Sequence, residues 1–478
     1  MLIAVFVSSA VAQTSWWRTY GGPSDDYGTS AQPTSDGGYV ITGFTGSFGP
    51  GGPNVWLIKT DASGDTLWTR TYGGTNYDYG NSVQPTSDGG YIVAGYTNTL
   101  GPGRVDVYLI NTNATGDTLW TRTYGGTNED EGWSVQQSSD GGYVIAGVTY
   151  SFGAGGGDVY LVKTNASGDT LWTRTYGGTH DDCGYSVQQT VDGGYIIAGM
   201  TNSSGAGPYD HDVYLIKTNA SGDTLWTRSY GDTNYDVGYS VQQTSDGGYI
   251  VAGRTTSFGA GYGDVYLIRT NASGDTVWTR TYGGTDDDLG HSVQQTTDGG
   301  YIIAGETYSF GAGSRDAYLI KTNASGDTLW TRTDGGTDED RGSSVEQTTD
   351  GGYIIAGFTE SFGSGGSDVY LVKTDADGHV AVEEPSGPRL TISRAAFRVQ
   401  PNPFRSFAVV PGHETDRFIL SDISGRKVGI CDGDRIGEGL PPGVYFLSPI
   451  AEPDVPHARL LRIVKGGWYR GRNRGDSK

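Results

Sequence analysis

Seven aspartates recur at near-constant spacing along most of the chain, and their carboxylates are the first groups to consider for chemistry. If the copies that carry these aspartates are arranged around an axis, their carboxylates form a ring of like charges that could focus a cation. Ca²⁺ takes several oxygen ligands in proteins. A ring spreads its carboxylates apart, however, so capping of local backbone N–H groups, as in Asx-turns, is the favoured interpretation. No cofactor is expected, and calcium is the one metal that these residues suggest. The seven are Asp26, Asp78, Asp130, Asp182, Asp236, Asp288 and Asp340.

The position three residues after each aspartate varies from copy to copy. Three successive copies place Trp133, Tyr185 and Tyr239 there, and the next copy places His291. Function in a repeat protein is expected where the copies differ, and clustered aromatic rings at a channel mouth could stack on a sugar or a peptide. Packing of the same rings between neighbouring repeats is an alternative of equal weight. These four residues are the predicted ligand-binding cluster.

A second variable position carries Arg254 in one copy and Glu306 in the next. We expect these two side chains to pair with each other at the surface. Such a pair is worth roughly 0–1 kcal/mol and implies no function.

Enzymatic chemistry has weaker support in the residue pattern. A sialidase-like site needs a cluster of arginines at the centre of the fold. The arginine that recurs in each copy is instead expected on the outermost strand. The six histidines show no metal-ligand spacing, and no pair of carboxylates stands out. Only Cys183 and Cys431 are present, which excludes a disulfide scaffold. A non-enzymatic role is therefore favoured, with a polysaccharide hydrolase or lyase and a structural spacer as alternatives.

The elements that carry these residues belong to a long internal repeat. An Asp-Gly-Gly triplet returns after 52, 52, 52, 54, 52 and 52 residues. A period of this length is typical of solenoids and propellers. The triplets begin at Asp36, Asp88, Asp140, Asp192, Asp246, Asp298 and Asp350.

Each repeat contains two hairpin patterns. In the second copy, runs at 82–86 and 91–95 flank Asp-Gly-Gly, and runs at 107–110 and 118–124 flank a second turn. The runs are short and rich in Val, Ile, Tyr, Thr and Trp, which favour strands. The second and third runs are apolar on both faces, so their sheet needs neighbours on both sides. Four-stranded sheets stacked around an axis form a β-propeller.

The two ends of the repeat region predict ring closure. The fourth-strand text occurs seven times, the first time at residues 17–20, before any first strand. The last third strand has no fourth strand after it in sequence. Seven complete blades therefore require the segment that starts at Trp17 to pair with the last third strand. We predict an all-β, closed seven-bladed propeller.

The remaining composition predicts the other parts of the chain. Residues 1–12 resemble the apolar core and A-x-A cleavage site of a secretory signal. The propeller is expected at 13–380, an acidic Pro/Gly linker at 381–388, a small β-sandwich at 389–467 and a basic, flexible tail at 468–478. No apolar run approaches the roughly 20 residues that span a bilayer.

Two regions resemble known families. The repeat text is similar to the bacterial β-propeller repeats called SBBP, and distantly to kelch repeats, which implies a propeller and no shared activity. The C-terminal region resembles the type A sorting domain of type IX secretion cargo in four ordered blocks. That resemblance implies the type IX secretion machinery as a partner. The blocks are QPNPF at 400–404, LSDISGR at 420–426, LPPGVYF at 440–446 and RIVK at 462–465.

The net charge of −22 argues against nucleic acid and anionic membranes as partners. We expect a monomeric protein, secreted or on the outer cell surface. Its expected role is to bind an extracellular glycan, peptide or matrix component.

Overall fold

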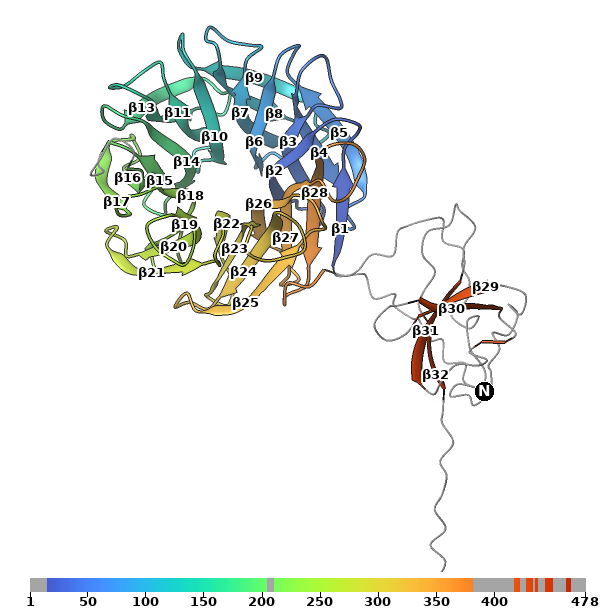
Figure 1. Ribbon diagram of the computed structural model, residues 1–478. Helices are drawn as coiled ribbons and strands as arrows, with labels where there is room; N and C mark the ends of the chain where they lie inside the picture. Colours follow the sequence, from blue (N-terminus) through green and yellow to red (C-terminus); the bar gives the residue numbers. More distant parts are fainter. Residues whose placement is uncertain are drawn as a thin grey trace, which may run out of the picture. The chain divides into compact units, whose positions relative to one another are not determined.

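The computed structural model describes residues 15–203 and 210–380, together with 417–421, 427–432, 435–436, 443–449 and 461–465. The chain divides into two compact units, Met1–Val382 and Glu383–Lys478. Among the residues described, the first unit holds seven four-stranded antiparallel sheets arranged around an axis as blades (Figure 1). The all-β, seven-bladed propeller expected from the repeat is confirmed.

Each blade runs from strand a at the centre to strand d at the rim. Strands a are β2 (Asp26–Pro33), β6 (Asp78–Pro85), β10 (Asp130–Gln137), β14 (Asp182–Gln189), β18 (Asp236–Gln243), β22 (Asp288–Gln295) and β26 (Asp340–Gln347). Strands b are β3 (Tyr39–Thr45), β7 (Tyr91–Thr97), β11 (Tyr143–Thr149), β15 (Tyr195–Thr201), β19 (Tyr249–Thr255), β23 (Tyr301–Thr307) and β27 (Tyr353–Thr359). Strands c are β4 (Asn54–Thr60), β8 (Asp106–Thr112), β12 (Asp158–Thr164), β16 (Asp212–Thr218), β20 (Asp264–Thr270), β24 (Asp316–Thr322) and β28 (Asp368–Thr374). Strands d are β5 (Thr66–Tyr72), β9 (Thr118–Tyr124), β13 (Thr170–Tyr176), β17 (Thr224–Tyr230), β21 (Thr276–Tyr282), β25 (Thr328–Asp334) and β1 (Trp16–Tyr20).

The N-terminal strand closes the ring. Strand β1 pairs antiparallel with β28 and supplies strand d of the seventh blade, as the strand count requires. The expected start of this strand is off by one residue. Trp16, not Trp17, lies opposite Lys373 in the register that Trp68 has opposite Lys59. Trp17 instead stacks on Phe362, with their ring centroids 5.0 Å apart.

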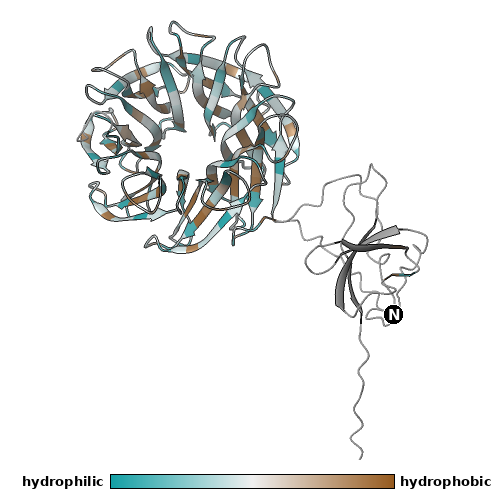
Figure 2. Cartoon of the chain, in the orientation of Figure 1, coloured by the Kyte–Doolittle hydropathy of each residue, from teal (hydrophilic) through white to brown (hydrophobic). Residues whose placement is uncertain are grey.

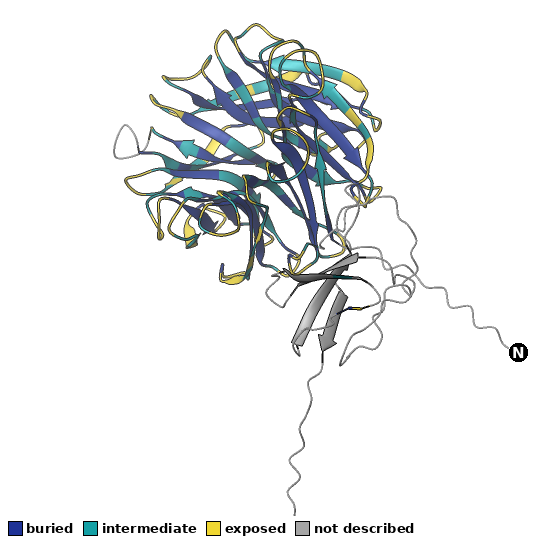
Figure 3. Cartoon of the chain, turned by 45° about the vertical axis from the view of Figure 1, so that its right-hand side comes forward, coloured by how far each residue is buried: buried dark blue, intermediate teal, exposed yellow. Residues whose placement is uncertain are grey.

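The core consists of layers between neighbouring blades. Strand β8 is buried along its whole length, and the equivalent strands of the other blades are buried almost throughout. One hydrophobic cluster lies at each of the seven seams between blades. Figure 3 shows buried strands enclosed by exposed turns, and Figure 2 shows hydrophobic positions concentrated on those strands. Burial on both faces explains why strands b and c carry apolar residues at successive positions.

The Asp-Gly-Gly segments form the tight turns between strands a and b. Gly89 has a φ of 87° and donates its N–H to the Thr86 carbonyl at 2.9 Å. A left-handed backbone favours glycine, so the repeated Gly follows from the turn geometry.

A ring of seven hydrogen bonds joins the strands a around the axis. In each blade a serine hydroxyl accepts the backbone N–H of the following blade, as in Val187 N–H to Ser134 Oγ at 3.2 Å. The ring includes the seventh and first blades, where Ala31 donates to Ser344 at 3.0 Å. The acceptors are Ser30, Ser82, Ser134, Ser186, Ser240, Ser292 and Ser344.

The second unit is described only in part. Its described strands are β29 (Arg417–Ser421), β30 (Lys427–Asp432), β31 (Gly443–Pro449) and β32 (Leu461–Lys465), in one sheet of order β30-β29-β31-β32. Strand β30 was not expected from the sequence. The strands expected at 397–399 and 408–410 lie outside the described residues, as do the signal, linker and tail segments, so the sandwich stays a prediction. Among the residues that the structure describes, no helix is long and apolar enough to cross a membrane.

Candidate functional site

A β-bulge in every strand a aims one side chain into the mouth of the central channel. In β10 the register with β11 shifts between Gly132 and Ser134, so Trp133 is the extra residue. Bulges redirect side chains in this way and are common beside binding sites. A Cβ on Gly132 would lie 2.8 Å from the Gly95 carbonyl oxygen of the preceding blade. At the six equivalent glycines a Cβ would lie 2.6–3.2 Å from the nearest backbone or side-chain atom, so crowding favours glycine before each bulge.

The mouth is a cavity of about 590 Å³. All four residues of the predicted cluster line it: Trp133, Tyr185, Tyr239 and His291. Further side chains come from the bulge position of the three remaining blades, from the residue after four of the aspartates, and from the end of strand b in four blades. These further lining residues are Tyr27, Thr29, Phe44, Tyr79, Asn81, Tyr96, Leu289, Glu306, Arg341, Ser343 and Phe358.

The aromatic rings at the mouth contact one another in a continuous arc. Trp133 meets Tyr185 at a centroid distance of 5.8 Å, Tyr185 meets Tyr239 at 5.4 Å, and Tyr239 meets His291 at 5.3 Å. Each contact crosses from one blade to the next, so the rings pack between blades and line the cavity at once. In the other direction the arc continues through Tyr96, Tyr79, Phe44, Tyr27 and Phe358.

A charged cluster fills the gap between the two ends of the arc. Glu306 is buried, and its Oε2 lies 3.3 Å from Arg315 Nη1 and 3.5 Å from Arg341 Nε. Burial opposes ionisation of Glu306, but His291 and the two guanidinium groups outweigh it and lower its pKa to about 2. Burial, with Arg341 nearby, lowers the pKa of His291. The cluster therefore holds an ionised carboxylate, two guanidinium groups and a neutral imidazole at neutral pH.

The expected pairing of Arg254 with Glu306 is wrong. Arg254 pairs with Asp287 and lies over the ring of Tyr235, 5.8 Å from its centroid. Glu306 instead pairs with Arg315 of its own blade and Arg341 of the next blade, because it lies at the end of strand b, beside the mouth.

The seven repeated aspartates are fully buried caps at the start of strand a. Asp78 Oδ2 accepts the Gly74 N–H at 2.8 Å and the Thr99 hydroxyl at 3.0 Å, and Asp78 Oδ1 accepts the Thr97 hydroxyl. All seven accept an N–H from four residues earlier, at 2.7–3.1 Å. Within the described ranges, no group of three or more His, Cys, Asp or Glu side chains could hold a metal ion.

Below the mouth, the channel is narrower and polar. A cavity of about 200 Å³ is lined by a segment of each strand a that reads Ser-Val-Gln in five of the seven blades. Glu346 replaces the glutamine of the seventh blade, and burial raises its pKa. Gln32 and Gln294 donate to its two carboxyl oxygens from the neighbouring blades. These two hydrogen bonds offset part of the free-energy cost of burying the Glu346 carboxyl group. They also join the seventh blade to both of its neighbours around the channel.

No family model matches. The regulatory protein FlaEY of Caulobacter vibrioides is 28% identical over 181 residues, which is 33% of this chain and 19% of that protein. The chain thus spans about a fifth of the length of that relative.

Several solved structures are similar to this chain at low sequence identity. Sqt1 from Chaetomium thermophilum is 13% identical with a TM-score of 0.43, covering 72% of this chain and 82% of that one. The extracellular domain of a putative hybrid two-component system from B. thetaiotaomicron is 12% identical with a TM-score of 0.42, covering 94% and 59%. YCF48 bound to a D1 peptide is 11% identical with a TM-score of 0.41, covering 77% and 100%.

Proposed function

We propose that this chain is a non-enzymatic binding protein that recognises a glycan, peptide or matrix component at the mouth of its propeller. The observation that carries the proposal is the arc of aromatic rings around a cavity of about 590 Å³. Apolar walls with a few convergent polar groups are typical of ligand sites. Flat rings accept sugar faces and peptide side chains alike, which leaves the three ligand classes to experiment.

The polar side of the mouth favours binding over catalysis. Glu306 is the one carboxylate among the described residues that line the mouth. Its pKa of about 2 keeps it ionised, so it cannot serve as the general acid that glycoside hydrolysis needs. Arg341 is 33% exposed and offers donors toward the cavity, where a ligand hydroxyl or carboxylate could accept them.

We place this binding role outside the cell. The apolar segment at 1–12 and the sorting-domain motifs between 400 and 465 support export through the type IX machinery, with 389–467 as the sorting domain. The repeat text supports assignment of 13–380 to SBBP-type repeats. Release of the protein into the medium by a strain with the type IX system, and its retention in a strain without the system, would test the export route.

The binding proposal is tested by screening the purified full chain on glycan and peptide arrays. Trp133→Ala removes a ring from the middle of the arc, and Trp120→Ala removes a ring of the same kind from outer strand β9. We expect a hit that is lost in Trp133→Ala and kept in Trp120→Ala. A hit that survives Trp133→Ala would contradict the mouth as the site, and the absence of any hit would favour a structural spacer.

A further inference from the structure

Six of the seven seams between blades are closed by the same tyrosine. The last residue of strand d donates its hydroxyl to a glycine carbonyl in the c–d turn of the next blade, as in Tyr282 to Gly326 at 2.6 Å. The ring fills the outer part of the seam. The six are Tyr20, Tyr72, Tyr124, Tyr176, Tyr230 and Tyr282, with O···O distances of 2.5–2.7 Å.

The seam between the sixth and seventh blades departs from this pattern at two positions. Asp334 stands where the other blades have the tyrosine, and its shorter side chain replaces the ring; Gly378 is the equivalent turn glycine. His379 stands where the other turns have an aspartate, and its Nε2 lies 3.1 Å from Arg332 Nη2. Arg332 lies over the Trp330 ring, 5.2 Å from its centroid, as the equivalent arginines do.

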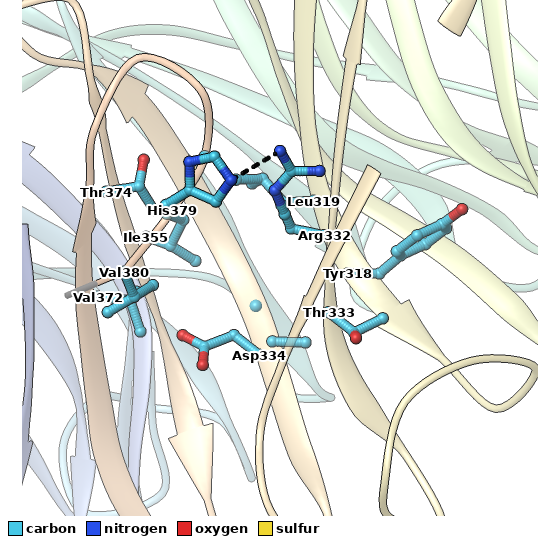
Figure 4. A pocket seen from close by; sticks show the side chains of 13 residues that line it. Tyr318, Leu319, Arg332, Thr333, Asp334, Ile355, Val372, Thr374, His379 and Val380 are labelled. Atoms are coloured by element: carbon cyan, nitrogen blue, oxygen red, sulfur yellow. Dashed lines mark hydrogen bonds between the residues drawn. The ribbon is translucent and has the colours of Figure 1, made fainter. Parts of the chain in front are cut away.

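The missing ring leaves a cavity of about 220 Å³ at this seam (Figure 4). Its walls include Leu319, Ile355, Val372 and Val380. Leu319 is 7% exposed, whereas the equivalent Leu267 is 0% exposed, so the cavity reaches the core layer. An apolar protein cavity of about 150 Å³ already admits benzene, so this one has room for an aromatic ring.

The cavity contains a poorly compensated carboxylate. Asp334 Oδ2 is buried and accepts no hydrogen bond from the described residues. Burial raises the pKa of Asp334 to about 6; the Tyr370 hydroxyl opposes that rise, while Asp340 and Asp316 add to it. Asp334 is the one carboxylate among the described residues that line the cavity, and Arg332 and His379 lie beside each other in its wall. A carboxylate oxygen that is buried without a hydrogen-bond partner is costly, and a cation would offset that cost.

We propose that the cavity between the sixth and seventh blades binds a small organic amine, with its ammonium group on Asp334 and an apolar body against Leu319, Ile355 and Val372. The ligand class follows from the two features that the seam combines. The absent tyrosine sets the size and apolar character of the body, and the aspartate sets the charge of the head group. The site is separate from the mouth, because the two cavities share no lining residue.

Benzylamine and benzyl alcohol are suitable probes, since they match in size and differ in charge. Titration calorimetry on the full chain compares the natural protein with Asp334→Asn, which keeps the shape, and with Asp334→Tyr, which refills the seam. We expect benzylamine to bind the natural protein, to bind Asp334→Asn at least about tenfold more weakly, and not to bind Asp334→Tyr, because hydrogen bonds to charged groups contribute that much. Benzyl alcohol should bind the natural protein and Asp334→Asn with similar affinity.

Two results would overturn the proposal. Equal affinity of benzylamine for the natural protein and Asp334→Asn would remove the ionic recognition, and undetectable binding to the natural protein would remove the site. Tyr282→Asp provides a gain-of-function comparison, since it builds the same substitution into the preceding seam. It should raise the benzylamine stoichiometry from one to two, and a folded variant with unchanged stoichiometry would contradict the argument from the missing ring.

Discussion

The seams between blades and the mouth of the channel are built from the same seven repeats, but the seams use positions at which the copies agree and the mouth uses positions at which they differ. At the seams, six of seven copies end strand d with a tyrosine that bonds the next blade. At the mouth, the bulge residue is different in almost every blade, from Thr29 to Trp133 to His291. Repeated positions therefore hold the ring of blades together, and varied positions are free to form a binding surface.

The largest expected effect comes from removing a seam tyrosine. Tyr124 is 8% exposed and donates to Gly168 at 2.7 Å. Tyr124→Ala should lower the free energy of unfolding by about 3–5 kcal/mol, the range for deleting a large buried aromatic side chain. Denaturant unfolding of the full chain measures it. Tyr262→Ala is the control, because Tyr262 is 76% exposed and its loss should change stability by no more than about 0.5 kcal/mol. Equal midpoints for the two variants would contradict the structural role of the seam tyrosines.

The charged cluster should make the mouth sensitive to acid. The pKa of Glu306 in the folded protein, about 2, lies below its ordinary value of 4.5. Its stabilising contribution is therefore complete above about pH 4.5 and is lost as the pH falls toward 2, by about 3 kcal/mol in total. Glu306→Gln should lack this part of the acid response. The measurement is the difference in unfolding free energy between the natural protein and the variant at several pH values. A difference that does not shrink between pH 5 and pH 3 would contradict the ionised state of Glu306.

Restoring the tyrosine at the seam between the sixth and seventh blades should raise the free energy of unfolding. The gain should be smaller than the loss caused by removing a seam tyrosine elsewhere. Asp334→Tyr rebuilds the hydrogen bond to Gly378 and fills the cavity of about 220 Å³. Cavity filling of this kind commonly adds about 0.5–2 kcal/mol. Thermal unfolding should show a higher midpoint than the natural protein, with Asp334→Asn as the control that removes charge without filling space. A lower midpoint would mean that the neighbouring blades cannot admit the ring.

The sequence predicted the ring far better than the mouth. The 52-residue period, the strand count and the apolar runs on β3 and β4 were sufficient for the propeller, because every copy repeats the same physical demand. The bulge at Trp133 was not predicted, since a bulge depends on the register of two strands. The partners of Glu306 were not predicted either, because Arg315 and Arg341 reach it from a loop and from the next blade. The variation at Tyr27, Phe44 and Arg341 was a signal for the rest of the mouth.

Trp133→Ala should have a small effect on stability and the largest effect on ligand binding. Trp133 and Trp120 are both partly exposed, but Trp133 lines the mouth and Trp120 packs against Tyr143 and Arg122 at a seam. Trp120→Ala should lower the unfolding free energy by at least about 2 kcal/mol and spare ligand binding. Trp133→Ala should lower it by about 1 kcal/mol, the scale of the contacts that its ring makes with Tyr96 and Tyr185, and should abolish binding. Unfolding midpoints and array binding, measured on both variants, separate the two roles. Trp133→Ala could instead lower the unfolding free energy as much as Trp120→Ala and still bind the ligand. The rings at the mouth would then serve only to pack blades together, and the division between repeated and varied positions would be wrong.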